Sequence, residues 1–240
     1  DYLTSVSKTD DFLFLPDSMN SNVKSFTNRN ETLGGVQYPS VIGDEVYVHW
    51  EPKKDVMYVN RRQEDLKMYE QQATLNGNLQ LRPAGMTGNG LMAFTGSELE
   101  SKLFRYKSEQ FDADTSDFRL TSDNASALAF DTKNVNAHID FVKRMGEFKS
   151  NGAGSYVNFP LNQYICFIDQ FKWFMDQKEI ELSSSSTAAV QDTATGISLT
   201  GSDFISVEAR QDSLRWKAPF ARYSLKDFLI KAEKVAFIQT

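Results

Sequence analysis

Apolar residues recur in short alternating runs along most of the chain. Glu45–Trp50 alternates apolar and polar positions, and five residues join it to a second apolar run, Val56–Val59, which predicts a β-hairpin. Leu75–Arg82 alternates with the same period of two, and Leu91–Phe94 resumes the pattern after the turn-rich segment Pro83–Gly88. The pattern therefore predicts short strands separated by short turns.

The middle of the chain repeats this pattern with regular spacing. Sandwiches, barrels and solenoids all show such spacing, but an uninterrupted series of clusters favours stacked strands. We therefore predict an all-β fold with little helix, in which stacked short strands form a solenoid-like or a rolled, jelly-roll-like sheet. Successive cluster centres lie roughly seven to twelve residues apart, at Phe104, Phe111, Phe118, Phe130, Ile139, Phe148, Val157, Cys166, Trp173 and Ile180.

Three segments depart from this pattern. Residues 1–40 are rich in Asn, Ser, Thr and Asp, which predicts a loosely ordered N-terminal arm with one short strand before a β-repeat domain at 41–240. Arg61–Gln72 has helix-forming composition but few apolar positions, so we expect a short, marginal helix at most. The serine-rich segment 183–202 predicts a long loop or a boundary within the domain.

Composition narrows the function classes. With 18 Phe among 240 residues and 40% hydrophobic content, the chain can build a packed core. The net charge is −6 and the basic residues are scattered, which disfavours nucleic-acid binding. No apolar run reaches the roughly 18 residues of a membrane-spanning helix. The first residue is Asp, and we expect that a signal segment has been removed.

The residues that commonly carry catalysis are scarce. Histidine is limited to His49 and His138. On a strand His138 shares a face with Asp140, as a general base and its orienting partner would, but a solvated polar face is the favoured interpretation. Cys166 lies in an apolar run and is expected to be buried and inert. No Gly-x-Ser-x-Gly motif is present, so we predict a non-enzymatic chain without catalytic residues.

Several carboxylates could bind a cation or cleave a sugar. Asp112, Asp114 and Asp117 resemble the oxygen-rich loops that hold calcium, but the motif lacks the glycine and the terminal glutamate of that site. We therefore predict solvated side chains and assign no metal or cofactor, although cation binding by the three stays open. A β-helical polysaccharide hydrolase or lyase would need converging acids, for which Asp140 and Asp169 are further candidates.

Two further groups have structural interpretations. Exposed aromatic rings could form a sugar-stacking platform from Phe167 to Phe174. With a period of two, Phe171 and Trp173 point to one side and Phe174 to the other, which favours a core role. Three glycines are spaced too irregularly for a dinucleotide fingerprint and are interpreted as turn residues, Gly85, Gly88 and Gly90.

Four stretches together resemble a known class of proteins, and they are Leu79–Gly90, Phe111–Phe118, Gln211–Tyr223 and Ala232–Ile238. They resemble large uncharacterised envelope-associated β-repeat proteins of Bacteroidetes-type bacteria. The repeats of those proteins are similar to the rolled-sheet modules of lipopolysaccharide-transport bridges (OstA-like) and of translocation-and-assembly proteins. The resemblance implies a stacked β scaffold in the periplasm or at the outer membrane, and it brings no catalytic residues.

The leading hypothesis is therefore a non-enzymatic structural or binding β module of a bacterial envelope protein. Its partners would be other parts of that protein and, in one version, a lipid, lipopolysaccharide or other hydrophobic ligand sheltered by an open apolar face. One alternative is a carbohydrate-binding or adhesin-like surface module with exposed aromatic rings. The other is the polysaccharide hydrolase or lyase.

Overall fold

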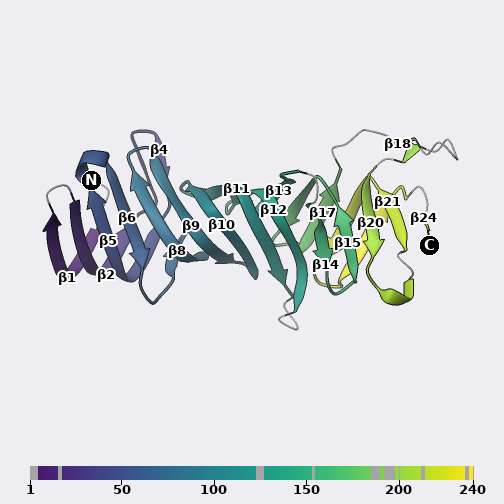
Figure 1. Ribbon diagram of the computed structural model, residues 1–240, viewed down its shortest axis with the longest axis horizontal. Coiled ribbons are helices and arrows are strands. Elements are labelled where there is room, and N and C mark those ends of the chain that lie inside the picture. The colour runs from purple at the N-terminus through teal and green to yellow at the C-terminus, as the bar shows by residue number, and fades with distance from the viewer. Residues whose placement is uncertain are drawn as a thin grey trace. The chain divides into compact units, whose positions relative to one another are not determined.

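The protein is described by a computed structural model (Figure 1). Side chains are described from residue 18 onward, except in 190–191 and 198–199. Much of the serine-rich segment 183–202 therefore lies outside the described residues. The described ranges are 5–15, 18–122, 127–152, 155–184, 190–191, 198–199, 201–211, 214–235 and 238–239.

Antiparallel strands make up most of the described chain, which confirms the all-β prediction. The helical elements of the described ranges are two three-residue 3₁₀ segments, η1 (Pro52–Lys54) and η2 (Ala209–Gln211). The residues form two compact units. Unit 1 comprises 1–114 with 140–142, and unit 2 comprises 115–139 with 143–240. The boundary thus lies outside 183–202, where the sequence placed a possible one.

Unit 1 is an antiparallel meander whose long strands pair with their sequence neighbours, β1 with β2, β8 with β9 and β9 with β10. Strands β11 (Gln110–Thr121) and β12 (Leu128–Asp140) have residues in both units. The strands of unit 1 are β1 (Ser5–Leu15), β2 (Ser18–Asn28), β3 (Glu31–Leu33), β4 (Val36–Tyr38), β5 (Val41–Glu51), β6 (Val56–Arg61), β7 (Leu66–Met68), β8 (Ala73–Arg82), β9 (Gly85–Phe94) and β10 (Ser97–Tyr106).

The described residues of 1–40 form paired strands, which corrects the prediction of a loosely ordered arm there. Strand β2 pairs with β5 from Met19 opposite Trp50 to Asn28 opposite Val41. Within β2, Val23 and Phe26 are buried while the Asn, Ser and Thr residues lie mainly at its partly exposed positions. A strand with one solvated face needs few apolar residues, so its composition resembled that of a loop.

The segment expected to hold a marginal helix is a broken strand. Strand β6 pairs with the second half of β5 and β7 pairs with its first two residues, so β6 and β7 run in the same direction along one neighbour. Leu66 and Met68 are fully buried. The burial of these two side chains, and the hydrogen bonds to β5 and β8, outweigh the helix propensity of the intervening polar residues.

The structure confirms the predicted hairpin and confirms the predicted glycine turn only in part. Strands β5 and β6 form the hairpin expected from Glu45–Trp50 and Val56–Val59, with Val48 opposite Val59. Gly85 closes the turn between β8 and β9, opposite Arg82, whereas Gly88 and Gly90 lie inside strand β9. A Cβ atom on Gly90 would lie 2.2 Å from the carbonyl oxygen of Asn76, and Gly90 has φ +122°. Glycine there allows the backbones of β8 and β9 to approach closely.

Unit 2 contains two runs of paired short strands, called here half A and half B. In half A the pairing order is β14 (Val157–Phe159), β15 (Tyr164–Phe167), β20 (Ser202–Ser206), β21 (Arg215–Ala218) and β24 (Ile238–Gln239). In half B it is β13 (Met145–Ser150), β16 (Gln170–Phe174), β17 (Glu179–Ser183), β22 (Phe220–Ser224) and β23 (Leu229–Glu233). Strands β18 (Val190–Gln191) and β19 (Ser198–Leu199) pair separately.

The chain passes repeatedly from one half to the other. Each passage joins a strand of one half to a strand of the other along the sequence. Strand β15 of half A continues into β16 of half B, and β21 continues into β22 around Pro219. Unit 2 is therefore a rolled sheet whose two halves face each other, as predicted. The four-residue turns of half B are linked by main-chain bonds, from Met175 N–H to the Arg144 carbonyl and from Leu225 N–H to the Lys178 carbonyl.

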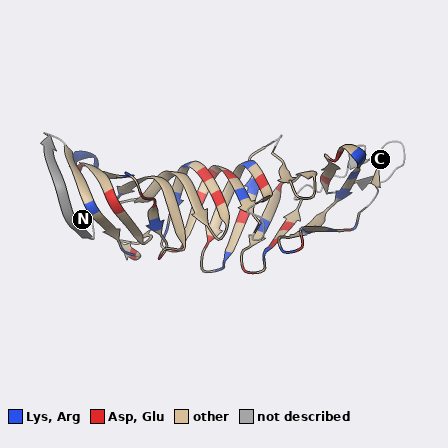
Figure 2. Cartoon of the chain, turned by 90° about the horizontal axis from the view of Figure 1, so that it is seen from below, with Lys and Arg blue, Asp and Glu red and all other residues tan. Residues whose placement is uncertain are grey.

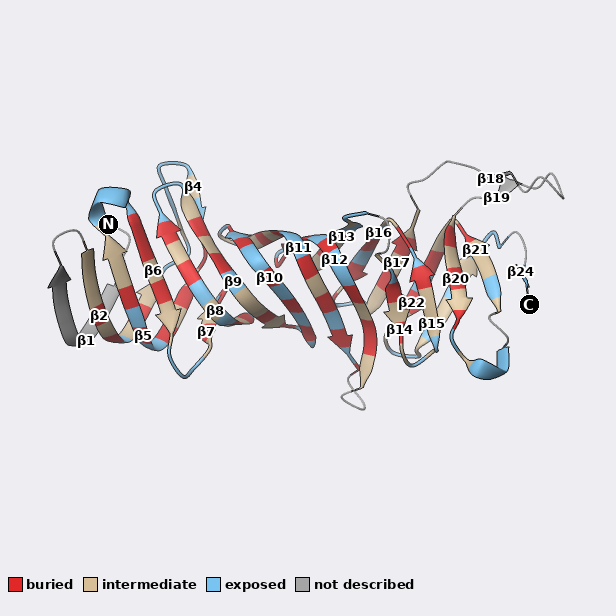
Figure 3. Cartoon of the chain, viewed as in Figure 1, coloured by how far each residue is buried: buried red, intermediate tan, exposed pale blue. Residues whose placement is uncertain are grey.

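The inner face of unit 2 is filled by aromatic side chains. The rings of Phe148 and Phe171 stack with centroids 4.5 Å apart inside half B. Across the halves, Phe159 of β14 meets Tyr223 of β22 with centroids 4.9 Å apart. Figure 3 shows buried and exposed positions alternating along these strands. The predicted cluster centres from Phe104 to Ile180 are all buried, as expected.

Unit 1 has its own aromatic core. Phe141 packs against Tyr69 with centroids 4.5 Å apart and against Phe94 at 5.6 Å, and Phe111 meets Phe104 edge to face at 5.6 Å. Burial strongly raises the pKa of the Tyr69 hydroxyl. Each unit therefore buries a core of contacting rings, and such pairs add stability beyond the area they bury.

We predict that Phe171→Ala lowers the free energy of unfolding by about 3–5 kcal/mol, because it leaves a cavity among contacting rings. Phe167, four residues earlier, is 42% exposed. Phe167→Ala is the matched control and should cost less than about 1 kcal/mol. Urea unfolding followed by circular dichroism measures both. Equal costs for the two variants would contradict the described core.

We also predict that stability falls as the pH rises above about 10, the usual pKa of tyrosine. Burial raises the pKa of Tyr223 to about 12 and strongly raises that of Tyr106. The unfolded chain therefore loses these protons first, and the stability present below pH 10 is lost as the pH rises through the folded values. In Tyr223→Phe the decline measured by urea unfolding should be shallower. An unchanged slope would contradict the assignment.

Candidate functional site

A short hairpin in unit 1 covers one end of strands β8 and β9. Strands β3 and β4 pair from Glu31 opposite Tyr38 to Leu33 opposite Val36. Gly34 and Gly35 form the turn, with φ of +57° and +85°. Positive φ at both central positions is the geometry of a type I′ turn, for which glycine carries no steric cost.

Three polar side chains hold this hairpin in place. The Tyr38 hydroxyl lies 2.8 Å from the carbonyl oxygen of Arg82 and donates to it, at the turn between β8 and β9. The buried Asn28 side chain donates to the carbonyl of Pro39 at 2.7 Å, which closes the base of the hairpin. Ser108 donates to the side-chain oxygen of Gln37 at 3.3 Å.

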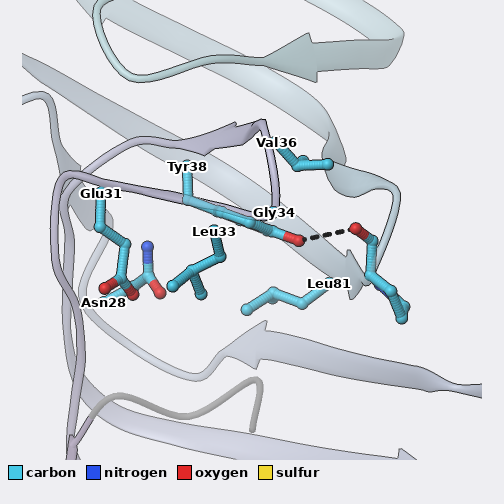
Figure 4. Close-up of a pocket in the computed structure, with 8 residues that line it drawn as sticks. Asn28, Glu31, Leu33, Gly34, Val36, Tyr38 and Leu81 are labelled. Carbon is cyan, nitrogen blue, oxygen red and sulfur yellow. Dashed lines mark hydrogen bonds between the residues drawn. The ribbon is translucent and has the colours of Figure 1, made fainter.

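A pocket of about 360 Å³ lies beneath the hairpin (Figure 4). Its apolar wall is formed by Leu33, Val36, Leu81 and Pro83, and its polar wall by Asn28, Glu31 and Tyr38. Ligand pockets begin at about 300 Å³, so this one has room for a small molecule only. Burial, and then the charge of Glu31, raise the pKa of the Tyr38 hydroxyl, which therefore stays protonated at neutral pH.

A wider depression of about 760 Å³ borders the hairpin strand β4. Arg82, Arg105, Lys107 and Asp112 contribute charged groups to its lining, beside Tyr106. The guanidinium of Arg105 lies 2.6 Å from Asp114, which holds the pKa of that carboxyl below its usual value. The hairpin thus separates a small, partly apolar pocket from an open charged surface.

A polar cluster around β5 was not predicted from the sequence. His49 Nδ1 lies 2.6 Å from the side-chain oxygen of Asn20, to which the Tyr47 hydroxyl also donates at 2.7 Å. His49 Nε2 lies 3.3 Å from Glu51, whose pKa is lowered by hydrogen bonds from Lys54 and then from His49. The pairing of β2 with β5 places Asn20 opposite His49, although the two residues are 29 positions apart in the sequence. No local sequence motif therefore predicts this cluster.

The sequence favoured a solvated polar face for His138 and Asp140, and the structure corrects this for Asp140, which is buried. Asp140 is 8% exposed and accepts a hydrogen bond from the Val142 N–H at 3.0 Å, at the turn after β12. His138 is half-buried on β12. Asp169 accepts a bond from the Ser184 hydroxyl at 3.0 Å.

The aspartates of β11 also have separate partners. Asp114 is paired with Arg105, and Asp117 accepts the Asn134 N–H at 3.1 Å. Asp112 lines the charged depression. Within the described ranges no three carboxylate, imidazole or thiol side chains gather as a metal site would require, so the three aspartates do not form one cluster.

The aromatic and cysteine predictions match the observed burial. Phe171 and Trp173 are 2% and 1% exposed, while Phe174 lies on the opposite side and is half-buried. Cys166 is fully buried, and burial strongly raises the pKa of its thiol. Phe167, the fourth candidate for a platform, is instead exposed on the outer face.

Opposite charges face each other across the outer side of half B. Lys172 lies 2.6 Å from Glu147 on the neighbouring strand, and Arg222 lies 2.9 Å from Glu181. Directly opposed residues link these four side chains into one series across β13, β16, β17 and β22. Figure 2 shows acidic and basic residues interspersed on neighbouring strands. We call this series the charge ladder.

Compared with models of protein families, with curated proteins and with solved structures, the chain matches none. In the described ranges no helix is long and apolar enough to cross a membrane.

We predict that Tyr38→Phe loosens the β3–β4 hairpin, because the carbonyls of Arg82 and Pro83 lose the hydroxyl that donates to them. The free energy of unfolding should fall by about 1 kcal/mol, and amide exchange should accelerate across 31–38. Tyr47→Phe, whose hydroxyl donates to an exposed side chain, is the control and should leave that exchange unchanged. Unaltered exchange in Tyr38→Phe would show that the hydroxyl does not anchor the hairpin.

Proposed function

We propose that this chain is a non-enzymatic structural and binding β module of a larger bacterial envelope protein. The proposal rests on the difference between the side chains on the two faces of the strands. Inward positions hold apolar and aromatic side chains in mutual contact, whereas charged side chains lie on the outer faces. A module of this kind supports or presents an outer surface.

In one version of the hypothesis the module shelters a lipid, and the packing of the inner face tests whether there is room for one. Such a role needs an apolar inner face left open. In unit 2, Phe118, Phe130 and Phe171 touch one another with centroids 5.1 to 6.4 Å apart, and Phe118 and Phe130 are fully buried. The pocket beneath the hairpin is a separate, smaller space with a charged residue, Glu31, in its wall. The geometry therefore favours a scaffold with a filled interior.

The surroundings of the carboxylates support the non-enzymatic part of the proposal. A sugar-cleaving site needs two acids that flank one bond. Asp114 is neutralised by Arg105, Asp140 accepts the Val142 N–H and Asp169 accepts the Ser184 hydroxyl. Each of these carboxylates thus has a local structural partner. The location in the envelope rests on the resemblance of the four sequence stretches.

The proposal predicts that the protein, expressed in bacteria and purified without detergent, carries no stoichiometric lipid in an organic extract analysed by mass spectrometry. Titration with the apolar dye N-phenyl-1-naphthylamine should give no saturable binding, because the rings fill the inner face. Phe171→Ala is the positive control, since an apolar cavity of this kind can admit a small hydrophobic ligand. One lipid retained per wild-type chain would contradict the filled interior and favour the sheltering role.

A further inference from the structure

The outer face of half A carries an exposed pair of aromatic rings. Tyr156, which directly precedes β14, is 46% exposed and Phe167 at the end of β15 is 42% exposed. Their ring centroids lie 6.2 Å apart with an angle of 57° between the planes. Strands β14, β15 and β20 lie side by side (Figure 3), and the half-buried Ile165 and Ile205 face each other beside this ring pair.

Polar groups with fixed positions border the rings. Asn158 pairs with Ile165 across the strands, and its amide donates to the carboxylate of Asp131 at 2.9 Å. On the other side, Arg215 donates through Nε at 2.7 Å, and through Nη2, to the carboxylate of Asp203, which lies opposite Phe167. These side chains are held by one another, so they present planar amide, carboxylate and guanidinium edges next to the rings.

Two lysines lie at the ends of this surface. Lys133 follows Thr132, which pairs with Val157, and so lies beside Tyr156. Lys217 lies opposite Asp203 on β21. Within the described part of the chain neither ammonium group has an ion pair or hydrogen bond. The strands between them place the two lysines roughly 19 Å apart, at about 4.8 Å per strand.

Cations lie among the side chains that border the rings. Lys133, Lys217 and Arg215 lie beside two carboxylates, Asp131 and Asp203, and Arg215 is paired with Asp203. The ammonium groups of Lys133 and Lys217, which have no partner among the described residues, lie on either side of the apolar centre. A matching ligand is elongated, has apolar C–H faces for the rings and hydroxyls for the planar polar groups, and carries anionic groups for the lysines.

We propose that this surface, named here the ring face, binds an acidic oligosaccharide built from uronic acids. The sugar rings pack their C–H faces on Tyr156 and Phe167. Their hydroxyls pair with Asn158 and Arg215, and their carboxylates lie at Lys133 and Lys217. This assignment names a ligand class for the binding role in the proposed function and rests on that role. It does not depend on the filled interior, which the lipid and dye measurements test separately.

The test is titration calorimetry of the full chain with oligogalacturonate and with oligomannuronate, and with a neutral cello-oligosaccharide of equal length. At least one uronic-acid oligomer should bind, and the neutral one should bind at least about tenfold more weakly. Binding should weaken as salt is raised, because Lys133 is exposed and Lys217 half-buried, so added ions screen both charges. Amide shifts in nuclear magnetic resonance should concentrate in 131–133, 156–167 and 203–217.

Variants assign the binding to the ring face. Phe167→Ala should weaken binding about tenfold, and Lys217→Gln should weaken it about threefold while flattening its salt dependence. Tyr47→Ala, an exposed tyrosine of unit 1, and Lys149→Gln, on the outer face of half B, are the matched controls and should bind as the wild type does. Circular dichroism confirms that each variant is folded.

Several outcomes would overturn the assignment. Absence of binding by both uronic-acid oligomers, or equal binding by the neutral oligosaccharide, would exclude the proposed ligand class. Wild-type affinity in both folded variants, Tyr156→Ala and Phe167→Ala, would exclude the ring face as the site. If the wild type also retains no lipid, the scaffold role stands without the glycan. If it retains one lipid per chain, the filled interior fails and the sheltering role is favoured, whatever the outcome for the glycan.

Discussion

The structure depends on one constraint. Every second side chain of these strands points to the same side of the sheet, and these apolar side chains must be buried against other apolar groups there. In unit 2 this need is met across the two halves, where Phe159 of β14 touches Tyr223 of β22. The Tyr223 hydroxyl also donates to the carbonyl of Ala129 at 3.2 Å, so even this polar atom is satisfied inside. A strand placed in either half thereby supports the other, and the short strands become stable together although none would be alone.

The filled interior leaves the outer faces to differ from one another. Half B presents the charge ladder, whose members are matched among themselves. Half A and the neighbouring strand β12 present rings and two lysines without partners among the described residues. Unit 1 adds a hairpin fixed by Tyr38 and Asn28, which creates hollows that a bare sheet lacks. Because the backbone scaffold is alike beneath them, these surfaces can vary in chemistry at little structural cost.

The sequence could predict what depends on local period. The opposite orientations of Trp173 and Phe174, the burial of Cys166 and the hairpin of β5 and β6 all follow from alternation along one strand. Features that depend on distant partners escaped it. The polar residues of β2 form a strand because they pair with β5, which the local sequence does not indicate. The break between β6 and β7 likewise depends on pairing with β5 and β8. The contact of His49 with Asn20, and the exposure of Phe167, likewise require the register of neighbouring strands.

The charge ladder has a consequence for how β16 finds its place beside β13. On the inner face, sliding one strand by two residues would bring Trp173 opposite Phe148 in place of Phe171, so burial at Phe148 discriminates poorly between these two alignments. On the outer face the same slide would bring Lys172 opposite Lys149 in place of Glu147. Repulsion between like charges would then oppose the misaligned pairing. Side chains that contribute little to the strength of the sheet thus help to select which of its near-equivalent alignments is populated.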